Sequence, residues 1–310
     1  GELIFSEISK ILLVTNLSNS PAALLSVMLI LAGIGFKISV VPFHSWAPDT
    51  YEGSPLPVTA YLSVSSKATG FVALMIILTK VFPDSGSSWG IILVIISALT
   101  MFIGNLSALQ QSNPVRLLAY SSIAQAGFIL APLAVAGITG DYADGIYASV
   151  TYLIIYAFMN LGAFLVVNVL INTSGSNNIY EWGGLAKHQP LTSVFATVFF
   201  FSLAGIPPLG GWFAKFVVFR SLLSTGEVYG VALAIIGAIN AVIGLVFYAR
   251  ISKIIWMDSP SENITVNTKP TLLGPLKVVG FISLVITFLA GIFPNIFSNL
   301  GNASALFFNS

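Results

Sequence analysis

The chain consists mainly of long apolar stretches separated by short polar segments. A helix needs about 20 apolar residues to cross a hydrocarbon core of ~30 Å. This pattern predicts about eight transmembrane helices and an all-α polytopic membrane protein. The helices are expected near residues 21–44, 55–82, 89–110, 115–138, 145–171, 190–223, 228–257 and 275–298. Residues 1–20 open with a short amphipathic stretch and are expected to lie at the membrane interface.

Two of the predicted helices carry residues that break a helix. The segment 205–211, GIPPLGG, lies in the middle of the 190–223 stretch, and Gly33, Gly35 and Pro42 lie within 33–42. Proline lacks the backbone donor and glycine permits non-helical turns, so both helices are expected to be broken. Interrupted backbone at membrane depth must be buried or must line a wet cavity, and in transporters it marks the ion site.

Composition supports a membrane protein and excludes several other classes. Hydrophobic residues make up 56% of the chain and charged residues 7%, whereas soluble domains carry roughly 25% charged residues. The loops are short, so residues 1–310 are expected to form a single membrane domain. The net charge of +1, without a basic run, gives no indication of nucleic-acid binding.

No cofactor is expected on the chain itself. It has no cysteine, which excludes disulfides and thiolate-bound iron–sulfur clusters, and its two histidines are His44 and His188. It shows no glycine-rich nucleotide-binding fingerprint.

Lysine and arginine residues near the predicted helix ends favour one orientation. One face would carry Arg116, Lys187, Arg250, Lys253, Lys269 and Lys277, and the other Lys10, Lys80 and Arg220. The first face is therefore expected to be cytoplasmic, or its organellar equivalent.

Three lysines, Lys37, Lys67 and Lys215, lie inside the apolar stretches. A lysine at the bilayer centre costs at least ~3 kcal/mol on insertion scales. Lys67 would lie ~18 Å from either surface, which is too deep for its side chain to reach the headgroups. Lys37 and Lys215 lie closer to helix ends but beside the predicted breaks, and snorkelling remains an alternative for Lys37. We expect these lysines to mark an ion or proton path.

Polar side chains on other predicted helices could order water between the lysines. They are Ser121, Ser122, Gln125, Tyr152, Tyr156, Asn160, Asn240 and Tyr248. Ordinary interhelical hydrogen bonding is the alternative for each of them. Desolvation lowers the pKa of an ammonium group in general and a nearby carboxylate restores it, yet no Asp or Glu lies in the middle of a predicted helix. An acidic partner is therefore expected on a segment or subunit outside this chain.

Several motifs resemble a known family. Residues 37–58, KISVVPFHSWAPDTYEGSPLPV, are followed by SVSSK ending at Lys67. The segment LAYSSIAQ covers 118–125, and LAGIPP at 203–208 continues to Lys215 and Phe216. These stretches resemble the antiporter-like subunits of respiratory complex I, NADH–quinone oxidoreductase, and are most similar to the N-type subunits, called subunit 2 in mitochondria and chloroplasts.

The resemblance implies an architecture. The chain would form the last eight helices of a fourteen-helix subunit built from two inverted repeats, with 21–82 ending the first repeat, 89–257 forming the second and 275–298 the final helix. The earlier helices, including a glutamate that pairs with Lys37 in the family, would be absent from the sequence.

The resemblance also implies a function and partners. Lys37, Lys67 and Lys215 would transfer protons, with Tyr120, Tyr248 and His44 in supporting positions. FMN, iron–sulfur clusters and quinone would belong to partner subunits, and the partners would be other membrane subunits, the lipid bilayer and, indirectly, the peripheral redox module. The expected location is a bacterial or archaeal plasma membrane, with the mitochondrial inner or thylakoid membrane as alternatives. A subunit of an Mrp-type cation/proton antiporter and a non-conducting membrane scaffold are the competing interpretations.

Overall fold

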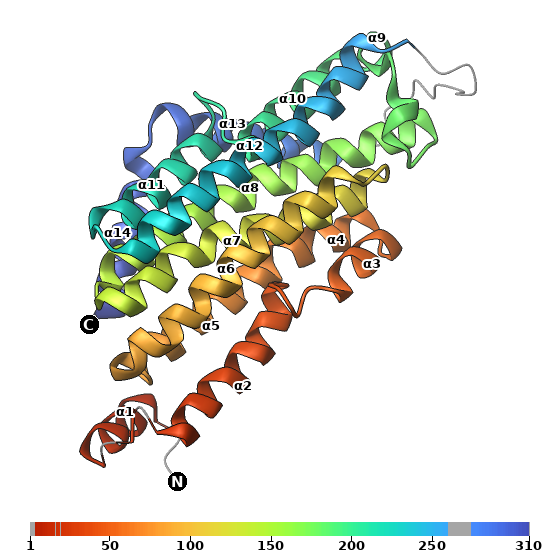
Figure 1. Ribbon diagram of the computed structural model, residues 1–310. Helices are drawn as coiled ribbons and strands as arrows, with labels where there is room; N and C mark the ends of the chain where they lie inside the picture. The colour runs from red at the N-terminus through yellow and green to blue at the C-terminus, as the bar shows by residue number, and fades with distance from the viewer. Residues whose placement is uncertain (1–3, 16, 19, 260–273, 310) are drawn as a thin grey trace.

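The computed structural model describes residues 4–15, 17, 18, 20–259 and 274–309, and every regular element among them is helical. Figure 1 shows these elements as a bundle of roughly aligned helices. The α-helices are α1 (Phe5–Val14), α2 (Pro21–Ile38), α3 (Trp46–Gly53), α4 (Leu56–Tyr61), α5 (Lys67–Lys80), α6 (Gly86–Leu109), α7 (Pro114–Thr139), α8 (Tyr142–Ser174), α9 (Leu185–His188), α10 (Pro190–Ala204), α11 (Gly210–Ser224), α12 (Val228–Met257), α13 (Gly274–Ile292) and α14 (Asn295–Asn309). A π-helical turn, Leu62–Ser66, joins α4 to α5.

Six helical segments of the described chain are long and apolar enough to cross a membrane, and a bent pair would make a seventh. The structure departs from the expected set of about eight spans at two places. The predicted 190–223 helix forms α10 and α11 of 15 residues each. The predicted helix over 275–298 is not continuous: α13 ends at Ile292, and α14 begins at Asn295 at an angle of 88° to it. Pro294 follows this helix end and cannot donate the next backbone hydrogen bond.

The two predicted breaks differ in their detail. Between α10 and α11, Gly205 adopts a φ of 96°, in the left-handed region that favours glycine. The first break begins at Ser39, within the expected range 33–42, and α2 runs without interruption through Gly33 and Gly35. Its span therefore ends at Ile38, not near residue 44, and Ser39 terminates it in the left-handed conformation. A Cβ on Gly35 would lie 2.9 Å from the Phe43 ring, so glycine permits the chain to fold back there.

The core of the bundle is built around α7 and α8. Nearly every residue of α7 is buried, and α7 packs between α6 and α8 (Figure 1). Small residues allow this close approach: a Cβ on Gly104 of α6 would lie 2.5 Å from the backbone nitrogen of Ala124 on α7. Close backbone contact through small residues is typical of helix association in membranes.

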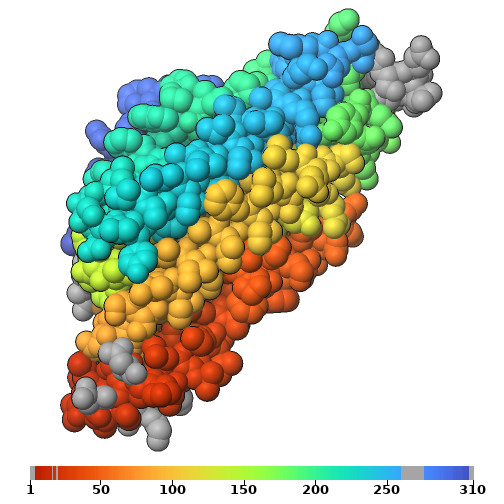
Figure 2. All heavy atoms as spheres, in the orientation of Figure 1, coloured from red at the N-terminus to blue at the C-terminus, as the bar shows by residue number. Residues whose placement is uncertain are grey.

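Helices α6 and α12 lie side by side on the face shown in Figure 2, and their outward-facing side chains are mainly apolar. Exposed large side chains recur every three or four residues along both helices: Ile91, Ile95 and Leu99 on α6, and Val231, Ile235, Ile239, Val242 and Val246 on α12. This spacing places each row on one side of its helix. Apolar rows facing outward are expected for helices in contact with lipid or with other membrane helices.

The bundle has two distinct ends. In Figure 1, α3 and α9 lie at one end, and α1 and α14 lie toward the other. At the α3 end, Arg116 at the start of α7 forms ion pairs with Asp49 at 2.6 Å and with Glu52 at 2.9 Å. These pairs hold α3 against α7. Of the basic residues used to predict the orientation, Lys269 lies outside the described residues.

Candidate functional site

Lys67 is the first residue of α5 and is buried, with 2% of its surface exposed. Its Nζ donates hydrogen bonds to the backbone oxygen of Ser122 on α7 at 2.9 Å and to the Ser122 hydroxyl at 2.8 Å. The Ser122 hydroxyl in turn donates to the carbonyl of Ala119. The amine is therefore held by neutral oxygens, and no ion pair to Lys67 is present among the described residues.

The π-helical turn directly precedes Lys67 and carries a second buried polar group. Ser63, in this turn, accepts a hydrogen bond from Asn160 Nδ2 of α8 at 2.9 Å and donates to the carbonyl of Ala60. Single π-helical turns within α-helices occur frequently at functional sites. The turn joins α4 to α5 and lies against α8.

Lys215 is the second buried lysine, with 6% of its surface exposed. Its Nζ donates to the carbonyl oxygens of Leu203 at 3.0 Å and Ala204 at 2.6 Å, the last residues of α10. The C-terminus of a helix carries partial negative charge and so stabilises a cation. The same Nζ lies 5.1 Å from the centre of the Phe128 ring, within cation–π range. The broken helix thus supplies the polar partners that a carboxylate would otherwise provide.

Gln125 on α7 connects the surroundings of the two lysines. Its Nε2 donates to the Leu203 carbonyl at 3.1 Å, the same oxygen that Lys215 contacts. Its Oε1 accepts a hydrogen bond from the Tyr152 hydroxyl of α8. Residues three apart on a helix are neighbours on its surface, so Gln125 lies one turn from Ser122, the partner of Lys67.

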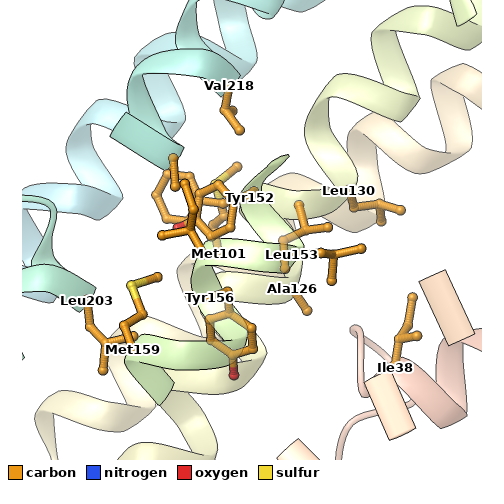
Figure 3. Packing of buried hydrophobic residues seen from close by; sticks show 14 of the residues in the cluster. Ile38, Met101, Ala126, Leu130, Tyr152, Leu153, Tyr156, Met159, Leu203 and Val218 are labelled. Carbon is orange, nitrogen blue, oxygen red and sulfur yellow. The ribbon is translucent and has the colours of Figure 1, made fainter. Parts of the chain in front are cut away.

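A row of polar side chains on α8 runs beside both lysine sites. Tyr152, Tyr156 and Asn160 are four residues apart, and Figure 3 shows Tyr152 and Tyr156 on successive turns, with Leu203 near Met159. The Tyr156 and Tyr51 hydroxyls both lie near the Ser122 side chain. Neither hydroxyl has a hydrogen-bond partner within normal distance among the described residues.

The other predicted site residues occupy different positions. Tyr248 is buried, stacks on Phe200 and forms a hydrogen bond with Ser121, so it lies next to the Lys67 acceptor on α7. Tyr120 is half-buried and lies near Arg116 at the start of α7.

Lys37 and His44 flank the interruption after α2. Lys37 is exposed on this chain, and its side-chain stem passes over Gly70, one turn after Lys67. His44 lies in the turn between α2 and α3. Burial lowers the pKa of His44, while a hydrogen bond with the Pro42 backbone acts in the opposite direction.

Five side chains at the lysine sites were not among the predicted site residues. Ser122, Gln125, Tyr152 and Tyr156 appeared only among polar side chains with an ordinary packing alternative, although the four-residue spacing on α8 was a usable signal. Tyr51, which α3 brings to Ser122, carried no distinguishing signal beyond its place in the 37–58 motif.

Comparison with known proteins identifies the family. Residues 1–244 match the transmembrane family of NADH:quinone oxidoreductase and Mrp antiporter subunits. The chain belongs to this family. With its long apolar helices, it is an integral membrane protein.

Among curated relatives of this antiporter-family chain, NADH-quinone oxidoreductase subunit N of Moorella thermoacetica is 39% identical over 99% of the chain and 62% of that protein. NAD(P)H-quinone oxidoreductase subunit 2 of a Picosynechococcus strain is 41% identical over 95% of the chain and 56% of that protein. The chain therefore spans about 60% of the length of such relatives. Their bacterial and cyanobacterial sources support a plasma or thylakoid membrane.

Solved structures show the same fold. A chain of respiratory complex I from Thermus thermophilus aligns with a TM-score of 0.72 at 27% identity, covering 91% of this chain and 60% of that one. A chain of an archaeal membrane-bound sulfane sulfur reductase aligns with a TM-score of 0.81 at 26% identity, covering 96% of this chain and 58% of that one. A chain of an Mrp complex from Dietzia aligns with a TM-score of 0.82 at 22% identity, covering 93% of this chain and 60% of that one. This likeness concerns the fold alone.

Gly211 positions the lysine-bearing half of the broken helix. Its backbone N–H donates to the Ser202 hydroxyl at 3.1 Å, and a Cβ there would lie 1.7 Å from the Ser202 carbonyl oxygen. Gly211→Ala must therefore push α11 away from α10, and we expect a loss of about 1–3 kcal/mol or more in stability.

Thermal unfolding of the purified membrane complex would measure this loss. Gly33→Ala is the matched control, because nothing lies within 4 Å of a Cβ at Gly33. It should leave the melting temperature unchanged or raise it, since alanine favours a helix over glycine. A Gly211→Ala variant with the same melting temperature as the parent would contradict the role of Gly211 in the close approach of α11 to α10.

Proposed function

We propose that the chain is a proton-translocating, antiporter-like membrane subunit of a redox-driven NADH:quinone oxidoreductase. One observation carries the proposal: two buried lysines without acidic partners in the described chain lie on opposite sides of one polar connection through α7 and α8. Buried ionisable groups of this kind in a membrane protein mark ion or proton pathways. The family and the curated relatives support a role in such a complex.

In the proposed relay, Lys67 and Lys215 are the two loading sites. A proton would pass from Lys67 to Lys215 along water molecules held by the hydroxyl groups of Ser122, Tyr156 and Tyr152, and Gln125 would orient Tyr152 without itself carrying the proton. Because buried hydroxyl groups need hydrogen-bond partners, water beside Tyr156 and Ser122 would complete the connection. Lysine suits this use because its protonation responds to neighbouring charge, whereas arginine stays protonated.

The two ends of the relay would open to opposite sides of the membrane. Lys37, whose stem lies against α5 near Lys67, would exchange protons with the cytoplasmic side. Toward the other end, α11 carries Arg220 five residues after Lys215, and Arg220 pairs with Asp144 at 2.7 Å in an open pocket of about 480 Å³. This pocket is the proposed exit. Segments 21–82 and 89–257 would correspond to the end of the first repeat and to the second repeat.

The energy for transport would come from partner subunits. FMN, iron–sulfur clusters and quinone would be held by those subunits. For the clusters, the chain lacks the cysteines that would bind them. Changes in charge at the quinone site would shift the proton occupancy of Lys67 and Lys215 through neighbouring membrane subunits.

The purified complex in sealed vesicles provides the test. We expect proton uptake that requires NADH and quinone, stops with a quinone-site inhibitor and continues without sodium. A sodium gradient that drives proton movement without an electron donor would overturn the proposal in favour of the Mrp-type antiporter. Full proton uptake by a complex in which Lys37, Lys67 and Lys215 are all methionine would overturn it in favour of a scaffold.

A further inference from the structure

A cavity of about 410 Å³ lies between α8, α10 and α13. Its walls are mainly apolar, with Val169 of α8, Phe195 and Phe199 of α10, and Phe281 of α13 among them. None of the residues of the proposed relay lines it. The proposed function therefore leaves this cavity without a role.

The polar groups of the cavity gather at one end. Gln189 and Thr192 at the start of α10 and the exposed Lys277 near the start of α13 line this end, whereas Phe199 lies deeper along α10. Figure 1 places the start of α10 beside α9, at the end of the bundle that also carries Arg116 and Lys187. The cavity thus has a basic mouth at the more basic end of the protein.

The length of the cavity matches one leaflet of a bilayer. From Gln189 to Phe199 it follows α10 for ten residues, or ~15 Å at 1.5 Å per residue. The hydrocarbon core is ~30 Å thick, so each leaflet contributes about half of it. A groove that begins at a cationic mouth and runs this far through apolar side chains fits an acyl chain with its headgroup at the mouth.

We propose that this cavity binds a glycerophospholipid with an anionic headgroup, its acyl chain against Phe195 and Phe199 and its phosphate at Lys277. Charge complementarity favours an anionic lipid, since a lysine near the membrane surface attracts such headgroups. A partner helix, ~10–12 Å wide, could not enter a cavity of about 410 Å³ whole, so only single side chains of such a helix could fill it.

Photo-crosslinking in the intact complex tests the proposal. The complex is reconstituted with phosphatidylglycerol that carries a photoreactive acyl chain, and labelled peptides are mapped by mass spectrometry. Gly280→Leu adds a side chain to the cavity wall, where Leu165 is the nearest group at 3.9 Å from a Cβ. Lys277→Gln removes the charge and leaves the cavity. Matched controls are Gly33→Leu on the open side of α2 and Lys253→Gln, an exposed lysine outside the cavity.

The parent complex should be labelled on peptides of α8, α10 and α13 that line the cavity. Gly280→Leu should remove this labelling, and Lys277→Gln should lower the preference for phosphatidylglycerol over phosphatidylcholine by about fivefold, the effect of one lysine near the surface. Both controls should behave as the parent.

Three results would overturn the assignment. They are labelling that survives Gly280→Leu, equal labelling by both lipids in the parent, and a crosslink from the cavity to a partner subunit. Because the readout is labelling, it does not depend on proton transport, so the two proposals can fail separately.

Discussion

Replacing Lys67 with methionine is expected to lower coupled proton translocation by about tenfold or more, because positioned proton-transfer groups contribute ~10²–10⁴-fold to rate. The substitution removes the amine that donates to Ser122 and leaves no other ionisable side chain at this point of α5. Methionine is flexible and apolar and fills similar space, so the bundle should still assemble. Removing a buried charge without an ion-pair partner should not destabilise the protein.

The measurement for Lys67→Met compares two activities of the same reconstituted complex. Proton uptake per NADH oxidised should fall, while electron transfer from NADH to an artificial acceptor at the peripheral module should continue at the parent rate. Lys80→Met is the matched control on the same helix, since Lys80 is the last residue of α5 and only half-buried. An unchanged proton-to-electron ratio in Lys67→Met would refute the role of this residue.

Much of the fold could be predicted because it depends on local properties of the chain. Hydropathy over about 20 residues defines a span, and GIPPLGG interrupts a helix wherever it occurs. The end of α2 at Ser39 could not be placed in this way, because it depends on the Phe43 ring packing back onto Gly35. The bend at Pro294 was missed because the apolar run continues on both sides of it.

The candidate site could be predicted only in part, for a related physical reason. Depth alone singled out Lys67, since it can be counted along one helix. Its acceptors depend on which faces of α5, α7 and α10 meet, and this is a long-range property. Tyr120 and Ser122 are two residues apart on α7, yet only Ser122 contacts Lys67 while Tyr120 lies near Arg116. The π-helical turn before Lys67 has no sequence signature that would have revealed this arrangement.

Substitutions of Lys215 can show whether this residue relays protons or only provides a permanent positive charge. As a fixed cation it would stabilise the C-terminus of α10 through the carbonyls of Leu203 and Ala204. Arginine would also supply that charge, because a guanidinium donates to carbonyl oxygens and stays protonated. A relay requires in addition that the group release its proton. Lys215→Arg and Lys215→Met are therefore both expected to lower proton translocation by about tenfold or more.

The decisive comparison is between these two variants in the reconstituted complex. The Arg variant should keep the thermal stability that the helix terminus gains from a cation, ~0.3–1 kcal/mol or more where buried, whereas the Met variant should lose it. A Cβ on Gly205 would lie 2.8 Å from Lys215 Cδ, so the site is tight, and the melting temperature must be measured to exclude misfit of the larger side chain. Lys80→Arg serves as the control. Parent-level proton uptake in a well-folded Lys215→Arg complex would show that Lys215 is a structural cation, because only proton release distinguishes the two roles.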